Sequence, residues 1–574
     1  METARRERAG RVIGAVEARL VAARDRLSGA WTRVADWSAP LREPARESSS
    51  YVPGDPEVRR RLWHCTLLGF IGSAAILWGA SQASSPFTTK SMVPPAWFFG
   101  LRQAPVLVNQ TPQPGIVFFC SLAAFYGGLV LVIRAWIRLH RLTRERPGIP
   151  VRYLAAVAGA WTLPILFVGP LLSNDVYSYV AQGEMMSHNI SPYKFGPAVL
   201  GLGGNSYTDL TARLWWYVTS PYGPLFLGLS GLIQTAVGSS ELAALVMFRV
   251  LALFGVGLVA VSVPRLARSF GRDAGAAFVF AVMNPLVLIH LVGGEHNDAL
   301  MLGFLVAGLA LARERHPILG LVFVALATLV KVPALIGVVY IGWDWAGEHS
   351  GFWRRVRQTA LAGLIAGVVM TALTELIGLG WGWVKGLGNP DSVRSYVDPA
   401  TAIGLGAARL LQAVGGGDHS HLLLTLARGS GAALATVIGV VLLVRSTPGA
   451  SRLRAVGFTM LAVVVLGPVV QPWYLVWGVI LLGPVVSGRF RVGLTWLVVI
   501  GTFLGIGDAT PAKPNPSSSI LREFEKANPL VFAATAVIVV GLLFGPDLVR
   551  LYRRVRAGTG APDGLVREEV TAGL

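Results

Sequence analysis

Long runs of apolar residues, separated by short polar segments, make up most of the chain. A helix that crosses the hydrocarbon core of a membrane needs about 20 predominantly apolar residues, and many of these runs reach that length. Their apolar residues are consecutive and do not alternate with a period of two, so a transmembrane β-barrel is not predicted. The pattern therefore predicts an all-α polytopic membrane protein with about 13 to 15 transmembrane helices.

The runs and the segments between them divide the chain into five parts. Within the first part, residues 3–37 have apolar positions at helical spacing among arginines. This pattern predicts an amphipathic helix that lies on the cytoplasmic membrane surface or docks on the protein's own loops. The five parts are a basic cytoplasmic N-terminal region (1–62), two transmembrane helices (63–149), a core with a large external loop at 173–221 (150–345), a second group of transmembrane helices (346–557) and a cytoplasmic tail (558–574).

The composition agrees with a membrane protein, since only 14% of the 574 residues are charged and the mean hydropathy is +0.57. The net charge of +19 is explained by basic loops that stay on the cytoplasmic side. The arginines are scattered among short loops and are not gathered on one domain, so nucleic-acid binding is not indicated. The two cysteines, Cys65 and Cys120, both lie in predicted spans, so neither a structural disulfide nor a cysteine metal site is expected.

The basic segments also orient the chain, because placing them inside puts the polar turns on the outer face. The loop after the third predicted span, which ends at about Leu172, is one of these outer turns. One region is inconsistent with this orientation. Two apolar stretches, 222–238 and 242–263, separate the outer loop from the basic segment 265–273. Two full crossings would place the arginines of that segment outside. We therefore expect the first stretch to be a shallow or re-entrant helix; the alternative is that this loop breaks the rule.

Polar residues are concentrated in the turns on the outer face. Ionisable side chains at a membrane boundary are costly unless they are paired or functional, so these turns are candidate sites. Each has a structural alternative, because a carboxylate after a helix can be solvated or can cap the next helix. Tryptophan and tyrosine are also common at membrane interfaces. The candidates in these turns are Asn174, Asp175, Tyr177, Tyr179, Glu184, Tyr222, Glu295, His296, Asn297, Asp298, Lys331, Trp473 and Tyr474.

Two cations are candidates for binding phosphate. Lys331 lies at a helix break without a carboxylate neighbour in the sequence, so it can snorkel or bind a lipid phosphate, and phosphate is favoured. Arg249 lies inside an apolar run, where an arginine normally faces the protein interior and pairs with an acid or a phosphate. Glu295, His296 and Asp298 are too close in sequence to form a complete metal site alone. Hydrogen bonding to sugar hydroxyls or ordering of the loops is therefore favoured over a metal.

The order of these motifs resembles that of the multispanning glycosyltransferases of the GT-C fold, which use polyprenyl-phosphate sugars. The motifs are "SNDVYSY", "SPYGPL", "NPLVLIHLVGGEHND", "VKVP" and "QPWYLVW", and the resemblance covers about 150 to 480. The segment "NDVYSYVAQGEMMSHNISPY" is most similar to the actinobacterial α-1,6-mannosyltransferases of the MptB type, which use polyprenol-phosphate-mannose to build the mannan core of lipomannan and lipoarabinomannan. The family pattern makes 150–345 the catalytic core and the two preceding helices accessory.

The resemblance implies an inverting single displacement on the outer face of the cytoplasmic membrane, from polyprenyl-phosphate-mannose to a lipid-anchored mannan. Asp175 would be the general base for the 6-hydroxyl of the acceptor, with Tyr177 and Tyr179 as walls of the site. Lys331 and Arg249 would bind the leaving phosphate, the polar residues of "GGEHND" would position a sugar, and no metal or other cofactor is expected. The alternatives are a transporter or flippase of a lipid-linked sugar, a GT-C enzyme for another sugar, or a non-catalytic scaffold. A transporter would carry its charges at the midplane, whereas polar residues gather here at one face.

Overall fold

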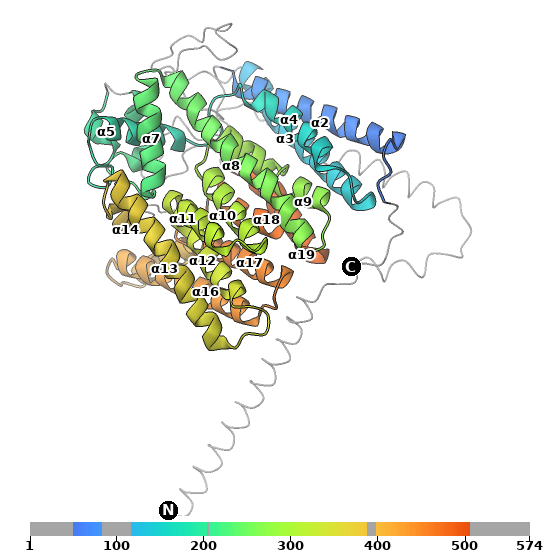
Figure 1. Ribbon diagram of the computed structural model, residues 1–574. Coiled ribbons are helices and arrows are strands. Elements are labelled where there is room, and N and C mark those ends of the chain that lie inside the picture. The colour runs from blue at the N-terminus through green and yellow to red at the C-terminus, as the bar shows by residue number, and fades with distance from the viewer. Residues whose placement is uncertain (1–49, 83–115, 204–205, 387–397, 505–574) are drawn as a thin grey trace, which may run out of the picture.

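The computed structural model describes residues 50–82, 116–203, 206–386 and 398–504 (Figure 1). The described residues form helices joined by turns, and no strand occurs among them, as the apolar runs predict. The amphipathic helix predicted at 3–37 and the cytoplasmic tail predicted at 558–574 lie outside the described residues.

Most helices follow one another through short connections. The α-helices are α2 (Pro56–Ala80), α3 (Ile116–Glu145), α4 (Val151–Ile165), α5 (Asp175–Ser187), α6 (Ser206–Leu210), α7 (Pro224–Val237), α8 (Glu241–Ser269), α9 (Ala274–Ala281), α10 (Asp298–Arg313), α11 (Pro317–Val330), α12 (Ile336–Trp345), α13 (Phe352–Ile377), α14 (Gly382–Gly386), α15 (Pro399–Ala413), α16 (Ser420–Arg445), α17 (Ala450–Leu466), α18 (Leu475–Leu482) and α19 (Gly488–Phe503). The tighter turns are η1 (Pro197–Leu200), η2 (Arg213–Trp215), η4 (Val332–Leu335) and η6 (Pro472–Tyr474), and η3 (Val287–Gly293) is a π-helical turn.

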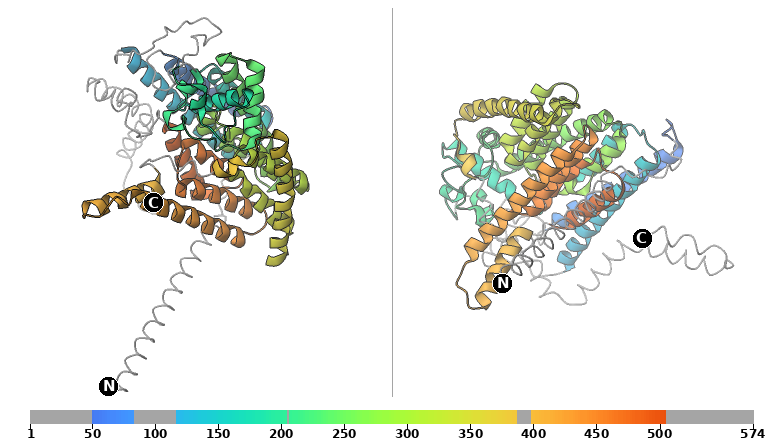
Figure 2. Two further views of the ribbon diagram at one scale, coloured as in Figure 1. Left: turned by 90° about the vertical axis from the view of Figure 1, so that its left-hand side faces the viewer. Right: turned by 90° about the horizontal axis from the view of Figure 1, so that it is seen from below.

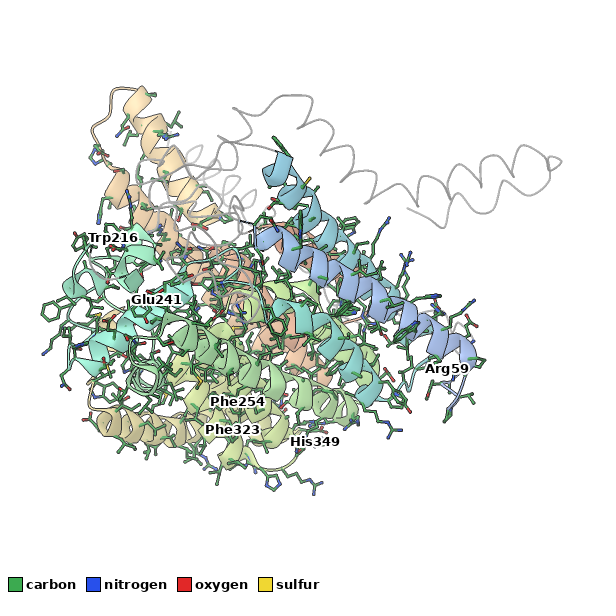
Figure 3. All side chains as sticks on the ribbon, turned by 90° about the horizontal axis from the view of Figure 1, so that it is seen from above. Arg59, Trp216, Glu241, Phe254, Phe323 and His349 are labelled. Atoms are coloured by element: carbon green, nitrogen blue, oxygen red, sulfur yellow. The ribbon has the colours of Figure 1, made fainter. Side chains whose placement is uncertain are left out.

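Five of the described helices, α2, α3, α8, α13 and α16, are long and apolar enough to cross a membrane, and five shorter apolar helices have 10–17 residues. Large apolar side chains are exposed on the outer faces of these helices, including Val250 and Phe254 of α8 and Leu364 and Val368 of α13. Figure 3 labels Phe254 of α8 and Phe323 of α11, and the ring of Phe304 in α10 lies between them, with its centroid 6.2 and 6.0 Å from theirs. Apolar faces of this extent suit contact with lipid. The chain is therefore an all-α membrane protein, and the expected number of crossings stays a prediction.

Glycines allow neighbouring helices to approach closely. A Cβ on Gly72 of α2 would lie 2.8 Å from the carbonyl oxygen of Gly128 in α3, and a Cβ on Gly303 of α10 would lie 2.5 Å from that of Gly255 in α8. Small residues at such crossings are typical of membrane helices, since helix association in lipid depends on close packing. Figures 1 and 2 show the first of these pairs, α2 and α3, side by side along one flank of the molecule.

The boundaries of three predicted segments differ in the structure. Helix α3 continues beyond its apolar run to Glu145, through arginines that the pattern of basic loops would place after the span. Arginine is a good helix former, and Pro147 is the first residue that stops a helix. The third predicted span stops at Ile165, shortly after Pro164, instead of at Leu172. The predicted loop 173–221 begins with helix α5.

Helix α7 occupies the first of the two apolar stretches, 222–238, for which a shallow or re-entrant helix is expected. It has 14 residues, which gives a length of about 21 Å, while the hydrocarbon core is about 30 Å thick. This length favours the expected shallow or re-entrant helix over a full crossing.

Candidate functional site

Two turns that are far apart in the sequence are joined by a backbone hydrogen bond. The amide of Leu171 donates to the carbonyl oxygen of Gly293 at 2.9 Å. Each turn contains a non-glycine residue with positive φ, Leu172 at 59° and Glu295 at 57°. Such conformations are strained and are often found at functional sites. The connection brings the "SNDVYSY" segment against the "GGEHND" segment, as the common outer face of these motifs predicts.

Asp175 is the first residue of α5, where a carboxylate is stabilised by the positive end of the helix dipole. Its amide donates to the hydroxyl of Ser173 at 3.1 Å, and its Oδ2 lies 3.5 Å from Nδ1 of His296. The Asp175 side chain is 21% exposed, whereas the His296 side chain is fully buried. Asp175 therefore combines a fixed position with an open side, which a base that meets an incoming hydroxyl requires.

His296 connects Asp175 to an aromatic motif from another part of the chain. Its ring stacks on Trp473 of η6 with the ring centroids 3.8 Å apart and the planes inclined by 18°. Trp473 contacts Tyr474 edge to face, with the ring centroids at 5.9 Å. Trp473 is buried, so it is an interior residue of the site and does not form part of an interfacial belt.

A second charged group lies in the same region. Nζ of Lys331 donates to both carboxylate oxygens of Asp298, at 3.0 and 2.9 Å, and Nε1 of Trp477 donates to Oδ1 of Asp298 at 2.6 Å. Nζ also lies 4.4 Å from the centre of the Tyr474 ring, a cation–π contact. Burial acts against protonation of Lys331, but the Asp298 carboxylate outweighs it, so the pKa of the lysine lies above its usual range. Lys331 has no carboxylate neighbour in the sequence, and its partner Asp298 comes from another helix. Phosphate binding by Lys331 stays a prediction.

Aromatic rings form one side of this region. Tyr179 and Tyr222 meet edge to face with ring centroids at 5.3 Å, and the hydroxyl of Tyr193 donates to the carbonyl oxygen of Tyr222 at 2.9 Å. Tyr177 is buried two residues after Asp175. Burial, followed by the charge of Asp175, raises the pKa of Tyr222 well above its usual range, so its hydroxyl stays protonated. Protonated phenols of this kind can donate hydrogen bonds to a ligand.

The "SPYGP" segment reaches its place because Gly223 has no side chain. The amide of Gly223 donates to the carbonyl oxygen of Val330 at 3.1 Å, and a Cβ at this position would lie 2.1 Å from the carbonyl oxygen of Leu329. This contact fixes Tyr222 beside the end of α11 that precedes Lys331.

We expect Gly223→Ala to lower the free energy of unfolding by about 1–3 kcal/mol, because overpacking against a backbone atom forces the segment to move. Thermal unfolding of the purified protein measures this change. Gly257→Ala in α8 is the matched control, because a Cβ there meets nothing within 4 Å and alanine is the better helix former. Equal unfolding midpoints for wild type and Gly223→Ala would contradict the close approach.

Arg249 and Glu295 form a buried ion pair behind the site. Nη2 of Arg249 donates to Oε1 of Glu295 at 2.5 Å, and Nη1 donates to the carbonyl oxygens of Leu166 and Val168 at 2.9 and 2.6 Å. These carbonyls follow the end of α4, where the helix leaves acceptors without partners. Burial raises the pKa of Glu295, and Arg249 opposes that rise. In the structure, Arg249 therefore pairs with an acid and stabilises the two turns.

Several buried polar atoms on His296, on the residue that follows it and on Trp473, which stacks on it, have no hydrogen-bond partner among the described residues. They are Nε2 of His296, both side-chain polar atoms of Asn297, and Nε1 of Trp473. Buried polar groups are nearly always satisfied, so a cluster of unsatisfied ones needs an explanation. Hydroxyl groups of a bound ligand would satisfy such donors and acceptors.

Two predicted site residues, Asn174 and Glu184, lie on α5 with Asp175. Asn174 is the N-cap residue of α5, directly before Asp175. Glu184 lies nine positions further along the same helix, about 13 Å from Asp175 along the axis, so the structure does not bring the two carboxylates together. No group of three His, Cys, Asp or Glu side chains in the described ranges is arranged to hold a metal ion. Independence of metal stays a prediction.

Sequence reasoning missed Trp477 and Tyr193. Trp477 contacts Asp298 directly, and its signal was its place four residues after Trp473 in "QPWYLVW", one helical turn along the same face. Tyr193 holds the Tyr222 carbonyl from the end of "SHNISPY", and nothing local in the sequence indicates that contact.

Comparison with known proteins adds independent information. Residues 66–347 match the family model described as alpha-(1->6)-mannopyranosyltransferase, N-terminal domain, and residues 400–544 match an MptB C-terminal domain. A probable α-(1→6)-mannopyranosyltransferase of Mycolicibacterium smegmatis is 34% identical, with 71% of this chain and 76% of the relative aligned. An α-(1→6)-mannopyranosyltransferase of Mycobacterium tuberculosis is 30% identical over 78% of this chain and 82% of the relative. No solved structure matches the chain.

Proposed function

Since the chain belongs to the family of α-(1→6)-mannopyranosyltransferases, we propose that it transfers mannose from polyprenyl-phosphate-mannose to a growing α-1,6-mannan. The acceptor is the lipid-anchored core of lipomannan and lipoarabinomannan. The reaction takes place on the outer face of the cytoplasmic membrane. The observation that carries the proposal is a part-exposed carboxylate, Asp175, set against the buried His296 ring, which stacks on Trp473 and precedes Asn297 in the chain. The side chains of His296, Asn297 and Trp473 all carry buried polar atoms without a hydrogen-bond partner in the described part of the chain.

Asp175 is the general base in this reaction. Its carboxylate takes the proton of the acceptor's 6-hydroxyl while that oxygen attacks the anomeric carbon of the donor mannose. The bond between the anomeric carbon and the phosphate oxygen breaks as the new bond forms, and polyprenyl phosphate leaves with the bonding electrons. Attack from the opposite side inverts the anomeric centre. His296 supports the base, because its Nδ1 lies 3.5 Å from Asp175 Oδ2.

The leaving phosphate needs positive charge close to the reacting atoms. Two features supply it: Lys331, which is 13% exposed, and the N-terminal ends of α5 and α10, where the helix dipoles favour an anion. We assign the phosphate to Lys331 in preference to Arg249, because the guanidinium of Arg249 is engaged by Glu295 and three backbone carbonyls.

The sugar rings of donor and acceptor are held by the aromatic and polar side chains around Asp175. Trp473 and Tyr222 offer ring faces and edges for stacking. Asn297 and His296 offer buried donors and acceptors without partners in the described part of the chain. A site that buries polar groups against substrate hydroxyls rejects analogues that lack those hydroxyls.

The proposal is tested with the purified full chain, radiolabelled polyprenyl-phosphate-mannose and a short α-1,6-mannoside. We expect a product one mannose longer, with an α-1,6 linkage that is established by digestion with a linkage-specific mannosidase. Donors carrying arabinose, glucose or galactose on the same lipid should give little product. Transfer of another sugar in preference to mannose would overturn the donor assignment. Absence of transfer from every lipid-linked sugar, together with movement of such a lipid across a vesicle membrane, would favour the transporter.

A further inference from the structure

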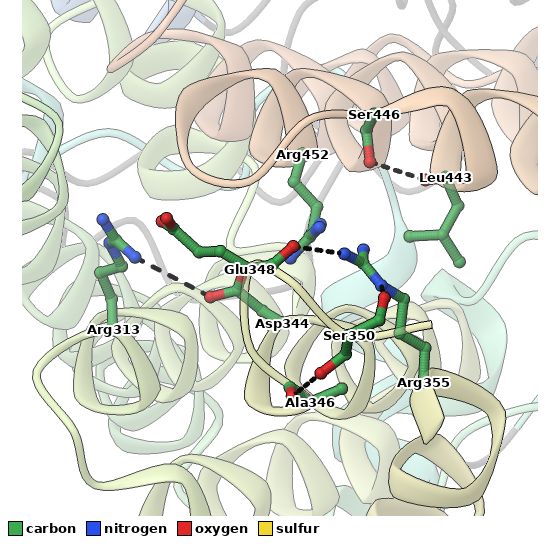
Figure 4. Close-up of polar contacts among 9 residues, drawn as sticks. All are labelled: Arg313, Asp344, Ala346, Glu348, Ser350, Arg355, Leu443, Ser446 and Arg452. Atoms are coloured by element: carbon green, nitrogen blue, oxygen red, sulfur yellow. Dashed lines mark hydrogen bonds and ion pairs between the residues drawn. The ribbon is translucent and has the colours of Figure 1, made fainter. Parts of the chain in front are cut away.

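Three arginines from different helices surround one carboxylate at a place that the proposed reaction does not use (Figure 4). Asp344, near the end of α12, pairs with Nη1 of Arg452 in α17 and lies 3.9 Å from Nη1 of Arg313 at the end of α10. Arg355 of α13 lies beside them and donates to the carbonyl oxygens of Ser350 and Glu348, both at 3.0 Å. We call Arg313, Arg355, Arg452 and Asp344 the arginine cluster.

The arginine cluster lies at the opposite end of the same helices that carry the candidate site. Helix α10 begins at Asp298 and ends at Arg313, and its 16 residues span about 24 Å. The segment formed by η4 and α12 begins directly after Lys331 and reaches Asp344 near its end. The two sites therefore face opposite ends of the helix bundle.

Positive charge is in excess in the arginine cluster. The Arg452 side chain is 0% exposed, and its Nε and Nη2 have no hydrogen-bond partner in the described part of the chain. Arg355 is held by neutral carbonyl groups, and Figure 4 shows the carboxylate of Glu348 pointing away from it. A buried guanidinium with unsatisfied donors is costly unless an anion completes its hydrogen bonds.

The N-terminal ends of α13 and α17 add to the excess of positive charge in the arginine cluster. Helix α13 begins at Phe352 after Gly351, and α17 begins at Ala450 after Gly449, and neither helix has a side chain that caps its first turn. Arg355 and Arg452 lie in or next to those first turns, where the helix dipole favours acidic residues. The unpaired amides and the guanidinium groups thus all favour negative charge at the same place.

We propose that the arginine cluster binds a phosphate group. Arg355 and the unpartnered Nε and Nη2 of Arg452 donate to its oxygens, while Asp344 continues to hold Nη1 of Arg452. Guanidinium groups suit this ligand because their planar donors match the oxygens of phosphate. The phosphate comes from the head group of an anionic lipid or from free inorganic phosphate. Basic pockets between membrane helices bind lipid head groups in this way.

The test compares thermal unfolding midpoints of the full chain in two arms. In detergent, sodium phosphate replaces sodium chloride at constant ionic strength; in nanodiscs, phosphatidylglycerol replaces phosphatidylcholine. Arg355→Gln and Arg452→Lys weaken the site, and the lysine keeps the charge that Asp344 requires. Arg354→Gln is the matched control, because Arg354 is exposed and lies next to Arg355 on the same helix.

We expect wild type and Arg354→Gln to be stabilised by a few degrees, and Arg355→Gln and Arg452→Lys to lose most of that shift. A shift with inorganic phosphate identifies the free anion as a ligand, and a shift with phosphatidylglycerol identifies the lipid head group. Absence of a shift in both arms would overturn the proposal. Equal shifts in wild type, Arg355→Gln and Arg452→Lys would also overturn it, since they would reflect a general ionic effect.

Discussion

Replacing Asp175 by asparagine is expected to lower kcat for mannosyl transfer by about 10²–10⁴-fold, the usual contribution of a positioned general base. Asparagine has nearly the same shape but cannot accept a proton from the acceptor hydroxyl at neutral pH. The fold should be retained, because Asp175 is part-exposed and its ionisable neighbour, His296, lies 3.5 Å away. The measurement is the transfer rate at saturating donor and acceptor, together with the thermal unfolding midpoint.

Asp418→Asn is the control for this variant. Asp418 is an exposed carboxylate next to the start of another helix, α16, where its Oδ1 accepts from the amide of Ser420. We expect wild-type transfer from it. An Asp175→Asn protein that is as active as wild type would contradict the assignment of Asp175 as the general base. An inactive protein with a lowered unfolding midpoint would instead show that Asp175 is needed for the fold.

Replacing Lys331 by methionine is expected to lower the free energy of unfolding by about 3–5 kcal/mol, because it leaves a buried carboxylate without its cation. Asp298 is 0% exposed, so water cannot take the place of the lysine. Among the described residues, only Trp477 would then donate a side-chain hydrogen bond to Asp298. Chemical unfolding at several denaturant concentrations measures the loss.

The double variant Asp298→Asn with Lys331→Met separates structure from catalysis. Its neutral asparagine can still accept from Trp477, so we expect most of the lost stability to return. Transfer should remain impaired, because the leaving phosphate has lost the Lys331 charge. Recovery of both stability and transfer would show that the Asp298–Lys331 pair is structural and would contradict the role of Lys331 at the phosphate.

The sequence predicted which turns carry candidate site residues, but it did not predict which of those residues contact one another. The sequence indicated Asp175, Tyr222, His296 and Trp473 because each is a polar or aromatic residue at one end of a long apolar run. The structure brings His296 to Asp175 and to Trp473. Glu184 was selected by the same reasoning, but α5 carries it away from Asp175. A residue's position in a turn is a local property, whereas its neighbours depend on how helices pack.

The class of the protein and the location of its polar turns were determined by the sequence alone. Hydrophobic run length and charge follow from neighbouring residues, and a membrane imposes both directly. Only the tertiary structure decided the partners of the two cations, which are Asp298 for Lys331, 33 residues away, and Glu295 for Arg249, 46 residues away. Such pairs form because packed helices bring charges together where water is excluded and an unpaired charge is costly. That cost is a property of the packed interior, so no local stretch of sequence records it.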